Sequence, residues 1–241
     1  MQPRMSELAR LQGTYGRMWW AAFSPDGSQV ATADDRAGLI WDAKTYRLLF
    51  TLPHGAEVYQ AAYTPDGARL VTVTDTVIRI WDAKDGTLVR ALGAMPTDSK
   101  PPDYFALAIS PDGRLVAAAD SAGSHVRVWD LTNGALVAEM SDRPANLAFP
   151  RLAFSTDGWL ATSGGDQARV FDVRTWKQLL AVPGPVRNLA SDAHGRLAIG
   201  AATGEVALWD VRSASRLRQL RPFGEPVDAV AFSSDGELLA E

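Results

Sequence analysis

The sequence predicts an all-β fold made of repeated four-stranded blades, the architecture of a β-propeller. Three observations lead to this prediction: an aromatic–aspartate pair recurs along the chain, a Ser-Pro-Asp-Gly type of turn recurs between the pairs, and short apolar runs alternate with turns without a helical period. Such units bury their apolar faces by stacking on one another, and blades around an axis accommodate several of them.

The first marker of the repeat is the aromatic–aspartate pair, which recurs every 38 to 48 residues. The pairs are Trp41-Asp42, Trp81-Asp82, Trp129-Asp130, Phe171-Asp172 and Trp209-Asp210. Recurrence at a fixed place in each unit indicates architecture. We therefore interpret the tryptophans as packing residues of the third strand that face the next blade, each with its N–H hydrogen-bonded.

The second marker is a tight turn that falls in phase with the first. It occupies residues 24–27, 64–67, 110–113, 155–158 and 233–236, and a degenerate copy occupies 192–195. Proline presets φ at the second turn position, and Asp and Gly suit the positions that follow. The aspartates are accordingly predicted to form turns and not to act as paired catalytic acids.

The second unit shows how each repeat is expected to fold. Apolar or β-branched runs at 58–63, 70–73, 77–81 and 87–92 are separated by turn residues, which gives four short strands. The same reading places blades at 17–53, 57–93, 103–141, 148–183 and 186–221, a partial blade at 227–241 and an N-terminal strand at 7–12, all in a single domain over 1–241.

These residues resemble the WD-repeat family over nearly the whole chain. In that family a His, a Ser or Thr, an Asp and the Trp of one unit form a buried hydrogen-bond network, and unit two has all four as His54, Thr72, Asp75 and Trp81. The resemblance therefore implies a structural network at these residues. The last unit stops before its third strand and its aromatic–aspartate pair, so we expect five complete blades plus a partial sixth, in an open or truncated ring.

Composition excludes several classes of function. The net charge of −4 and the pI of about 5.4 give no long-range attraction to phosphate, so no nucleic-acid partner is expected. The chain has no cysteine, and its three histidines lie in three different units, so no metal site, cofactor or catalytic residue is predicted. Neither a signal peptide nor an apolar span of membrane length is found, which leaves no membrane association and a cytoplasmic location as the expectation.

One position of the innermost strand, four residues before that strand's last residue, is the candidate partner-binding position. It is occupied by Trp19, Tyr59, Phe105, Pro150, Arg187 and Asp228. Aromatic and Arg side chains dominate binding hot spots, so the candidate binding residues are Trp19, Tyr59, Phe105, Arg187 and Asp228. The long loop at 93–103 is expected on the same face. The alternative is that these side chains pack between blades.

The leading hypothesis is a non-catalytic scaffold that presents a rigid surface to a partner protein or peptide. Two alternatives stay open. The chain could be a structural portion of a longer multidomain WD-repeat regulator with no separate partner, or a propeller enzyme with its site in the central channel. The second needs several inward His or carboxylate ligands, whereas the innermost strands offer Ala and aromatic residues. The partner and the oligomeric state do not follow from the sequence.

Overall fold

The computed structural model describes residues 11, 18–93, 104–121, 125–141, 150–164, 167–220, 225–233, 235–237 and 239–240. In these residues all regular structure is β-strand, and every strand pair is antiparallel, which confirms the predicted all-β class. The chain divides into two compact units, Met1–Thr74 with Ile78–Ala91 (unit 1) and Asp75–Val77 with Leu92–Glu241 (unit 2).

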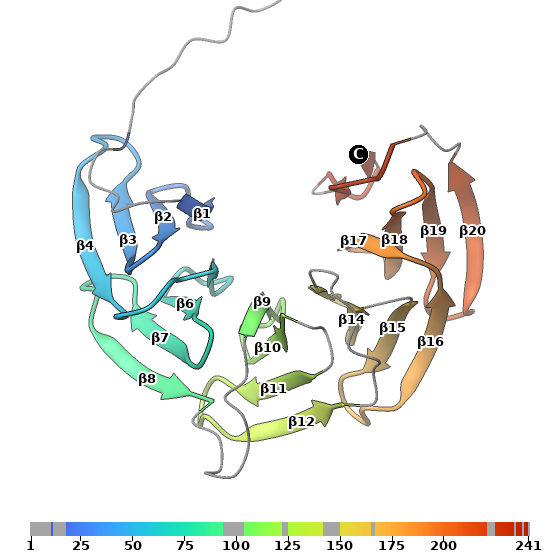
Figure 1. Cartoon of the computed structure of the whole chain (residues 1–241), viewed down its shortest axis with the longest axis horizontal. Helices are drawn as coiled ribbons and strands as arrows, with labels where there is room; N and C mark the ends of the chain where they lie inside the picture. Colours follow the sequence, from blue (N-terminus) through green and yellow to red (C-terminus); the bar gives the residue numbers. More distant parts are fainter. Residues whose placement is uncertain are drawn as a thin grey trace, which may run out of the picture. The chain divides into compact units, whose positions relative to one another are not determined.

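Unit 1 contains two four-stranded sheets in which the strands follow one another in chain order (Figure 1). The first sheet consists of β1 (Met18–Phe23), β2 (Gln29–Asp34), β3 (Ala37–Asp42) and β4 (Leu48–Pro53). The second consists of β5 (Gln60–Tyr63), β6 (Arg69–Val73), β7 (Ile78–Asp82) and β8 (Leu88–Leu92). These are blades one and two.

Unit 2 contains three further four-stranded sheets with the same strand order, blades three to five (Figure 1). Blade three has β9 (Tyr104–Ile109), β10 (Leu115–Asp120), β11 (Val126–Asp130) and β12 (Leu136–Met140). Blade four has β13 (Arg151–Phe154), β14 (Trp159–Gly164), β15 (Gln167–Asp172) and β16 (Gln178–Pro183). Blade five has β17 (Val186–Ser191), β18 (Arg196–Ala201), β19 (Val206–Asp210) and β20 (Ser215–Leu220).

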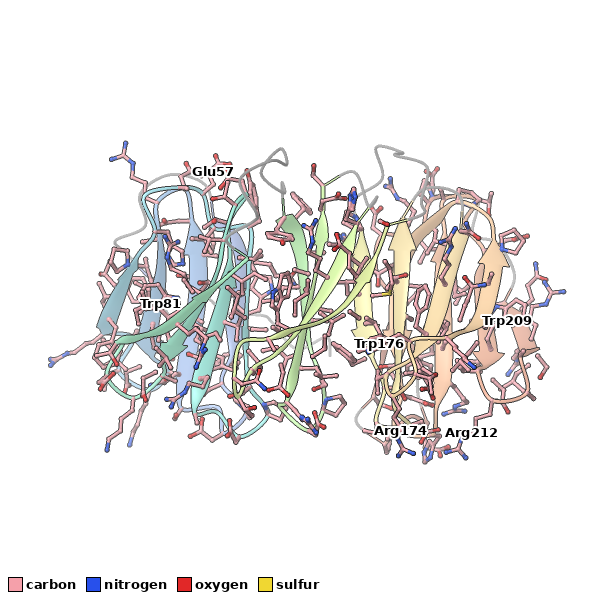
Figure 2. The ribbon with its side chains drawn as sticks, turned by 90° about the horizontal axis from the view of Figure 1, so that it is seen from below. Glu57, Trp81, Arg174, Trp176, Trp209 and Arg212 are labelled. Carbon is pink, nitrogen blue, oxygen red and sulfur yellow. The ribbon has the colours of Figure 1, made fainter. Side chains whose placement is uncertain are left out.

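The aspartate of each aromatic–aspartate pair closes the turn between the third and fourth strands. In blade one Asp42 Oδ1 accepts backbone N–H bonds from Lys44 at 3.1 Å and Thr45 at 2.6 Å. Counted from the aspartate as the first residue, the fifth residue of this turn lies in the left-handed region in all five four-stranded blades. These residues are Tyr46, Gly86, Gly134, Trp176 and Ala214. The third residues of the turns in blades four and five, Arg174 and Arg212, lie at the same end of their sheets (Figure 2). The aspartates of the aromatic–aspartate pairs are thus turn formers.

The apolar core of unit 1 lies between its two sheets. Trp81 of β7 is buried together with Ile40 and Leu52 of the first sheet. The prediction that the tryptophans face the next blade is therefore wrong for Trp81, which faces the preceding one. The strand alternation defines two faces of a sheet, and Trp81 shares its face with Thr72, the side on which His54 lies.

The partial sixth blade is a two-stranded sheet in unit 2, formed by β21 (Ala231–Phe232) and β22 (Leu239–Ala240). Arg196 of β18 attaches it to blade five, because one guanidinium nitrogen donates to the Gly236 carbonyl at 2.6 Å and the same group lies 5.7 Å from the Phe232 ring centre. Of the predicted N-terminal strand only Leu11 lies among the described residues, and it packs against the cluster that includes Trp41. Of the loop 93–103, only Gly93 lies among the described residues.

Candidate interaction site

A chain of hydrogen bonds runs through blade two. The Trp81 indole N–H donates to Thr72 Oγ1 at 2.9 Å, and Thr72 Oγ1 lies 2.7 Å from His54 Nε2. Asp75 does not take the place that the resemblance implies for it. His54 Nδ1 lies 2.7 Å from the Leu52 carbonyl, and Asp75 Oδ1 is buried with no hydrogen-bond partner among the described residues.

The neighbours of His54 define its protonation. A carbonyl can only accept, so Nδ1 carries the proton that bonds Leu52, and Nε2 is left to accept from the Thr72 hydroxyl. The pKa of His54 is lowered from 6.5 to about 4, mainly by burial and in smaller part by the nearby Arg79 charge. The ring is therefore neutral near pH 7 and is a structural group.

The same bond exists in blade one and is missing in blade five. Trp41 Nε1 donates to Thr32 Oγ1 at 3.0 Å, but the buried Nε1 of Trp209 has no acceptor among the described residues. The cross-strand register explains this difference: Leu197 lies opposite Trp209 as Leu70 lies opposite Trp81, and the residue two further along is Ile199 in the place of Thr72. Ile199 offers no hydroxyl.

The candidate binding positions of unit 1 are Trp19 and Tyr59. Trp19 lies within β1, and its side chain is outside the described part of the structure. Tyr59 is half-buried just before β5, where its N–H donates to the Val73 carbonyl at 3.0 Å. Tyr59 thus lies immediately before the innermost strand of blade two.

The candidate positions of unit 2 include a charged pair. Phe105 is half-buried in β9, Pro150 is buried, and Arg187 and Asp228 are exposed. The Arg187 guanidinium donates to Asp228 Oδ1 at 2.6 Å, and Asn188 Nδ2 donates to the Asp228 carbonyl at 3.1 Å. The structure thus brings Arg187 and Asp228 together across 41 positions of sequence.

The sequence interpretation missed Arg151, the first residue of β13. This side chain is half-buried, and its guanidinium donates to the Pro150 carbonyl at 3.3 Å. Burial lowers the pKa of Arg151, and the charge of Arg187 lowers it further. Counting back from the turn selects Pro150 in this blade, so the neighbouring arginine escaped notice.

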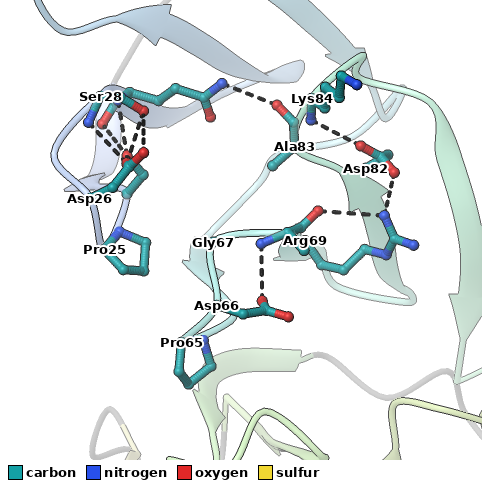
Figure 3. Close-up of a pocket in the computed structure, with 13 residues that line it drawn as sticks. Pro25, Asp26, Ser28, Pro65, Asp66, Gly67, Arg69, Asp82, Ala83 and Lys84 are labelled. Carbon is teal, nitrogen blue, oxygen red and sulfur yellow. Dashed lines mark hydrogen bonds and ion pairs between the residues drawn. The ribbon is translucent and has the colours of Figure 1, made fainter.

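Unit 1 also has a groove of about 700 Å³ between the turns of its two blades (Figure 3). Its carboxylates are already bonded. Asp26 accepts from the Ser24 and Ser28 hydroxyls, which lowers the pKa of Asp26 to about 2, and Asp82 is paired with Arg69. These aspartates hold the turns in place, so no carboxylate of the groove is arranged as a general base.

No group of three or more His, Cys, Asp or Glu residues arranged to hold a metal occurs in the part of the chain that the structure describes.

Within the described ranges, no helix has the length and apolar character needed to cross a membrane.

Comparison with known proteins matches these features to a repeat family. The model of the family described as WD domain, G-beta repeat matches residues 5–42, 46–82 and 102–130. WD repeat-containing protein VIP3 of Arabidopsis thaliana is 31% identical over 148 residues, covering 53% of this chain and 45% of that protein. The target of rapamycin complex subunit wat1 of Schizosaccharomyces pombe is 31% identical over 139 residues, covering 55% of this chain and 44% of that protein.

A solved structure extends the likeness to most of the chain. A chain in the crystal structure of the mitotic checkpoint complex aligns with a TM-score of 0.77 at 19% identity, covering 92% of this chain and 70% of that one. At this identity the likeness concerns the fold alone, and it confirms the predicted propeller type. The chain spans less than half the length of the two curated relatives.

Proposed function

This chain belongs to the WD-repeat family, and from that premise we propose that it is a non-catalytic scaffold for a partner protein or peptide. The blades act in this proposal as one domain over residues 1–241. One relative, the target of rapamycin complex subunit wat1, is by its name part of a protein complex, which supports a protein as the partner. We also propose a cytoplasmic location, which fluorescence microscopy of the tagged chain tests.

The observation that carries the proposal is the exposed pair of Arg187 and Asp228 at the repeat position expected to bind. The side chains of Arg187 and Asp228 are 47% and 80% exposed, and they bond one another at 2.6 Å. An exposed ion pair contributes little to folding stability, so a role in recognition accounts for these residues better than a role in packing. Loops and strand ends on a rigid scaffold are the usual place for binding residues.

A second candidate function is favoured by the partial coverage of the relatives. The chain would then be a structural portion of a longer WD-repeat regulator and would have no separate partner. The partner experiment separates the two candidates, because a purely structural portion enriches no protein that depends on the candidate residues.

The test is affinity purification of the tagged chain from cells that express it, followed by mass spectrometry. Wild type is compared with the double variants Tyr59→Ala with Phe105→Ala and Arg187→Ala with Asp228→Ala. The matched control is Leu88→Ala with Leu179→Ala, because these exposed residues lie on outer strands. We expect a partner that wild type and control enrich and that at least one candidate pair loses at an unchanged melting temperature. Equal enrichment by all four proteins, or no enrichment at all, contradicts the proposal.

A further inference from the structure

Two arginines start two innermost strands of unit 2 that contact each other. Arg151 is the first residue of β13 and Arg187 the second residue of β17. Their guanidinium charges interact, since the charge of Arg187 lowers the pKa of Arg151. The two strands are also aligned, because the Ser191 hydroxyl at the end of β17 donates to the Phe154 carbonyl at the end of β13 at 2.7 Å. The two like charges therefore lie at the same end of neighbouring strands.

The single negative charge of Asp228 does not balance the two positive charges of Arg151 and Arg187. Asp228 is the ion-pair partner of Arg187, and its effect on Arg151 is the weakest of the influences on that residue's pKa. Arg151 itself makes no ion pair among the described residues, and its guanidinium donates to the neutral Pro150 carbonyl. The three groups carry a net charge of +1, which one further carboxylate would balance.

The geometry suits a carboxylate from outside the chain. A guanidinium presents five N–H donors, so the bonds to Asp228 and Pro150 leave donors of both arginines for another acceptor. Asn188 also holds the Asp228 backbone, which keeps the pair in place at the strand ends. Arginine forks bind carboxylates with two parallel bonds, which are stronger than bonds between neutral groups.

We propose that Arg151 and Arg187 form an anchor for an Asp or Glu side chain of an acidic segment in the partner protein. This inference rests on the proposed scaffold function and adds the chemistry of the partner. In this proposal Asp228 orients Arg187 and competes with acidic ligands for its guanidinium, which lowers the affinity for those ligands. A single carboxylate fits the net charge of the three groups better than a multiply charged nucleic-acid backbone does.

The test measures binding of fluorescein-labelled hexaglutamate to the full chain by fluorescence anisotropy at low salt. Hexaglutamine with the same label is the uncharged control, and a labelled six-nucleotide single-stranded DNA tests the nucleic-acid alternative. The variants are Arg151→Gln, Arg187→Gln and Asp228→Asn. Arg218→Gln on the outer strand β20 is matched to the two arginine variants in charge change. Circular dichroism melting checks that each variant is folded.

We expect Arg151→Gln and Arg187→Gln each to weaken hexaglutamate binding by about tenfold, because each removes charge-assisted bonds. Arg218→Gln should change it by less than about twofold, and Asp228→Asn should strengthen it. The proposal is overturned if Arg151→Gln and Arg187→Gln bind like Arg218→Gln, if Asp228→Asn weakens binding, if hexaglutamine binds equally well, or if the DNA binds more tightly.

The purification experiment keeps this outcome separate from that of the proposed function. A partner that is captured equally by wild type, Arg151→Gln and Arg187→Gln leaves the scaffold function standing and overturns the acidic anchor. Absence of any partner in every purification contradicts the scaffold function, whatever the peptide measurements give.

Discussion

The Trp81 indole N–H donates to the Thr72 hydroxyl at 2.9 Å, and this bond is the difference between a repeat unit with a closed network and one without. In blade five the register places Ile199 where blade two has Thr72, so the buried N–H of Trp209 is left without an acceptor in the described structure. Blade four has Phe171 in the place of the tryptophan, which shows that the fold accommodates a ring with no N–H.

Replacing the two tryptophans by phenylalanine should therefore have unequal costs. Trp81→Phe removes a hydrogen bond and leaves a buried hydroxyl network short of a donor, so it should lower the free energy of unfolding by about 1–3 kcal/mol beyond the loss of ring volume. Trp209→Phe removes an unpaired buried N–H and should cost only the lost volume. Urea unfolding followed by circular dichroism measures both, with Trp41→Phe as a further bonded case. Equal costs for Trp81→Phe and Trp209→Phe would contradict the conclusion that the Trp81 N–H is hydrogen-bonded and the Trp209 N–H is not.

The turn after the third strand gives a second prediction. Ala214 is exposed with φ of 51°, a conformation that costs an L-residue roughly 1–2 kcal/mol and glycine almost nothing. Ala214→Gly should therefore raise the free energy of unfolding by up to about 1 kcal/mol, after the entropy that glycine loses. The converse, Gly86→Ala, should lower it by more, because a Cβ there would meet the Phe50 side chain at 2.9 Å. A melting temperature that falls for Ala214→Gly would show that this turn does not need the left-handed conformation.

The sequence predicted the blades well because turn chemistry is local. Pro, Asp and Gly determine each tight turn within four residues, and the aspartate of each aromatic–aspartate pair bonds residues two or three positions away. What failed depends on distant groups. His54 Nδ1 bonds the Leu52 carbonyl instead of Asp75, and which blade Trp81 faces is decided by packing that strand alternation does not encode. The pair of Arg187 and Asp228 was selected by position, whereas the place of Arg151 on the neighbouring strand follows only from how the strands pack.

The buried His54 should make stability depend on pH. Its pKa in the folded chain is about 4, against 6.5 when exposed, so the unfolded chain binds a proton first as pH falls. The contribution of neutral, buried His54 to the free energy of unfolding is fully present above about pH 6.5 and is lost as pH falls towards 4. The difference between the two pKa values corresponds to on the order of 3 kcal/mol. Melting temperatures measured from pH 7.5 to pH 4.5 should therefore decline for wild type.

His54→Gln should flatten that decline between pH 6.5 and 5, although its melting temperature at pH 7.5 will be lower because the bonds to Leu52 and Thr72 are disturbed. The matched control is His125→Gln, since the His125 side chain is 42% exposed. An unchanged slope in His54→Gln would mean that other groups cause the pH dependence.

The partial sixth blade should be the least protected described part of unit 2. Among the described residues, β21 and β22 are each two residues long and pair only with each other, whereas β18 pairs along its length with both β17 and β19. Few ladder bonds and exposed neighbours lower the free energy of local opening. In hydrogen exchange followed by mass spectrometry, amides of 225–240 should therefore exchange much faster than those of 196–201. Phe232→Ala removes the ring that packs with Val227 and Val230 and that Arg196 covers, so it should speed exchange in 225–240 further and leave 196–201 nearly unchanged. Equal protection of the two segments in the wild-type chain would show that the sixth blade is held by more than the contacts described, and the prediction would be wrong.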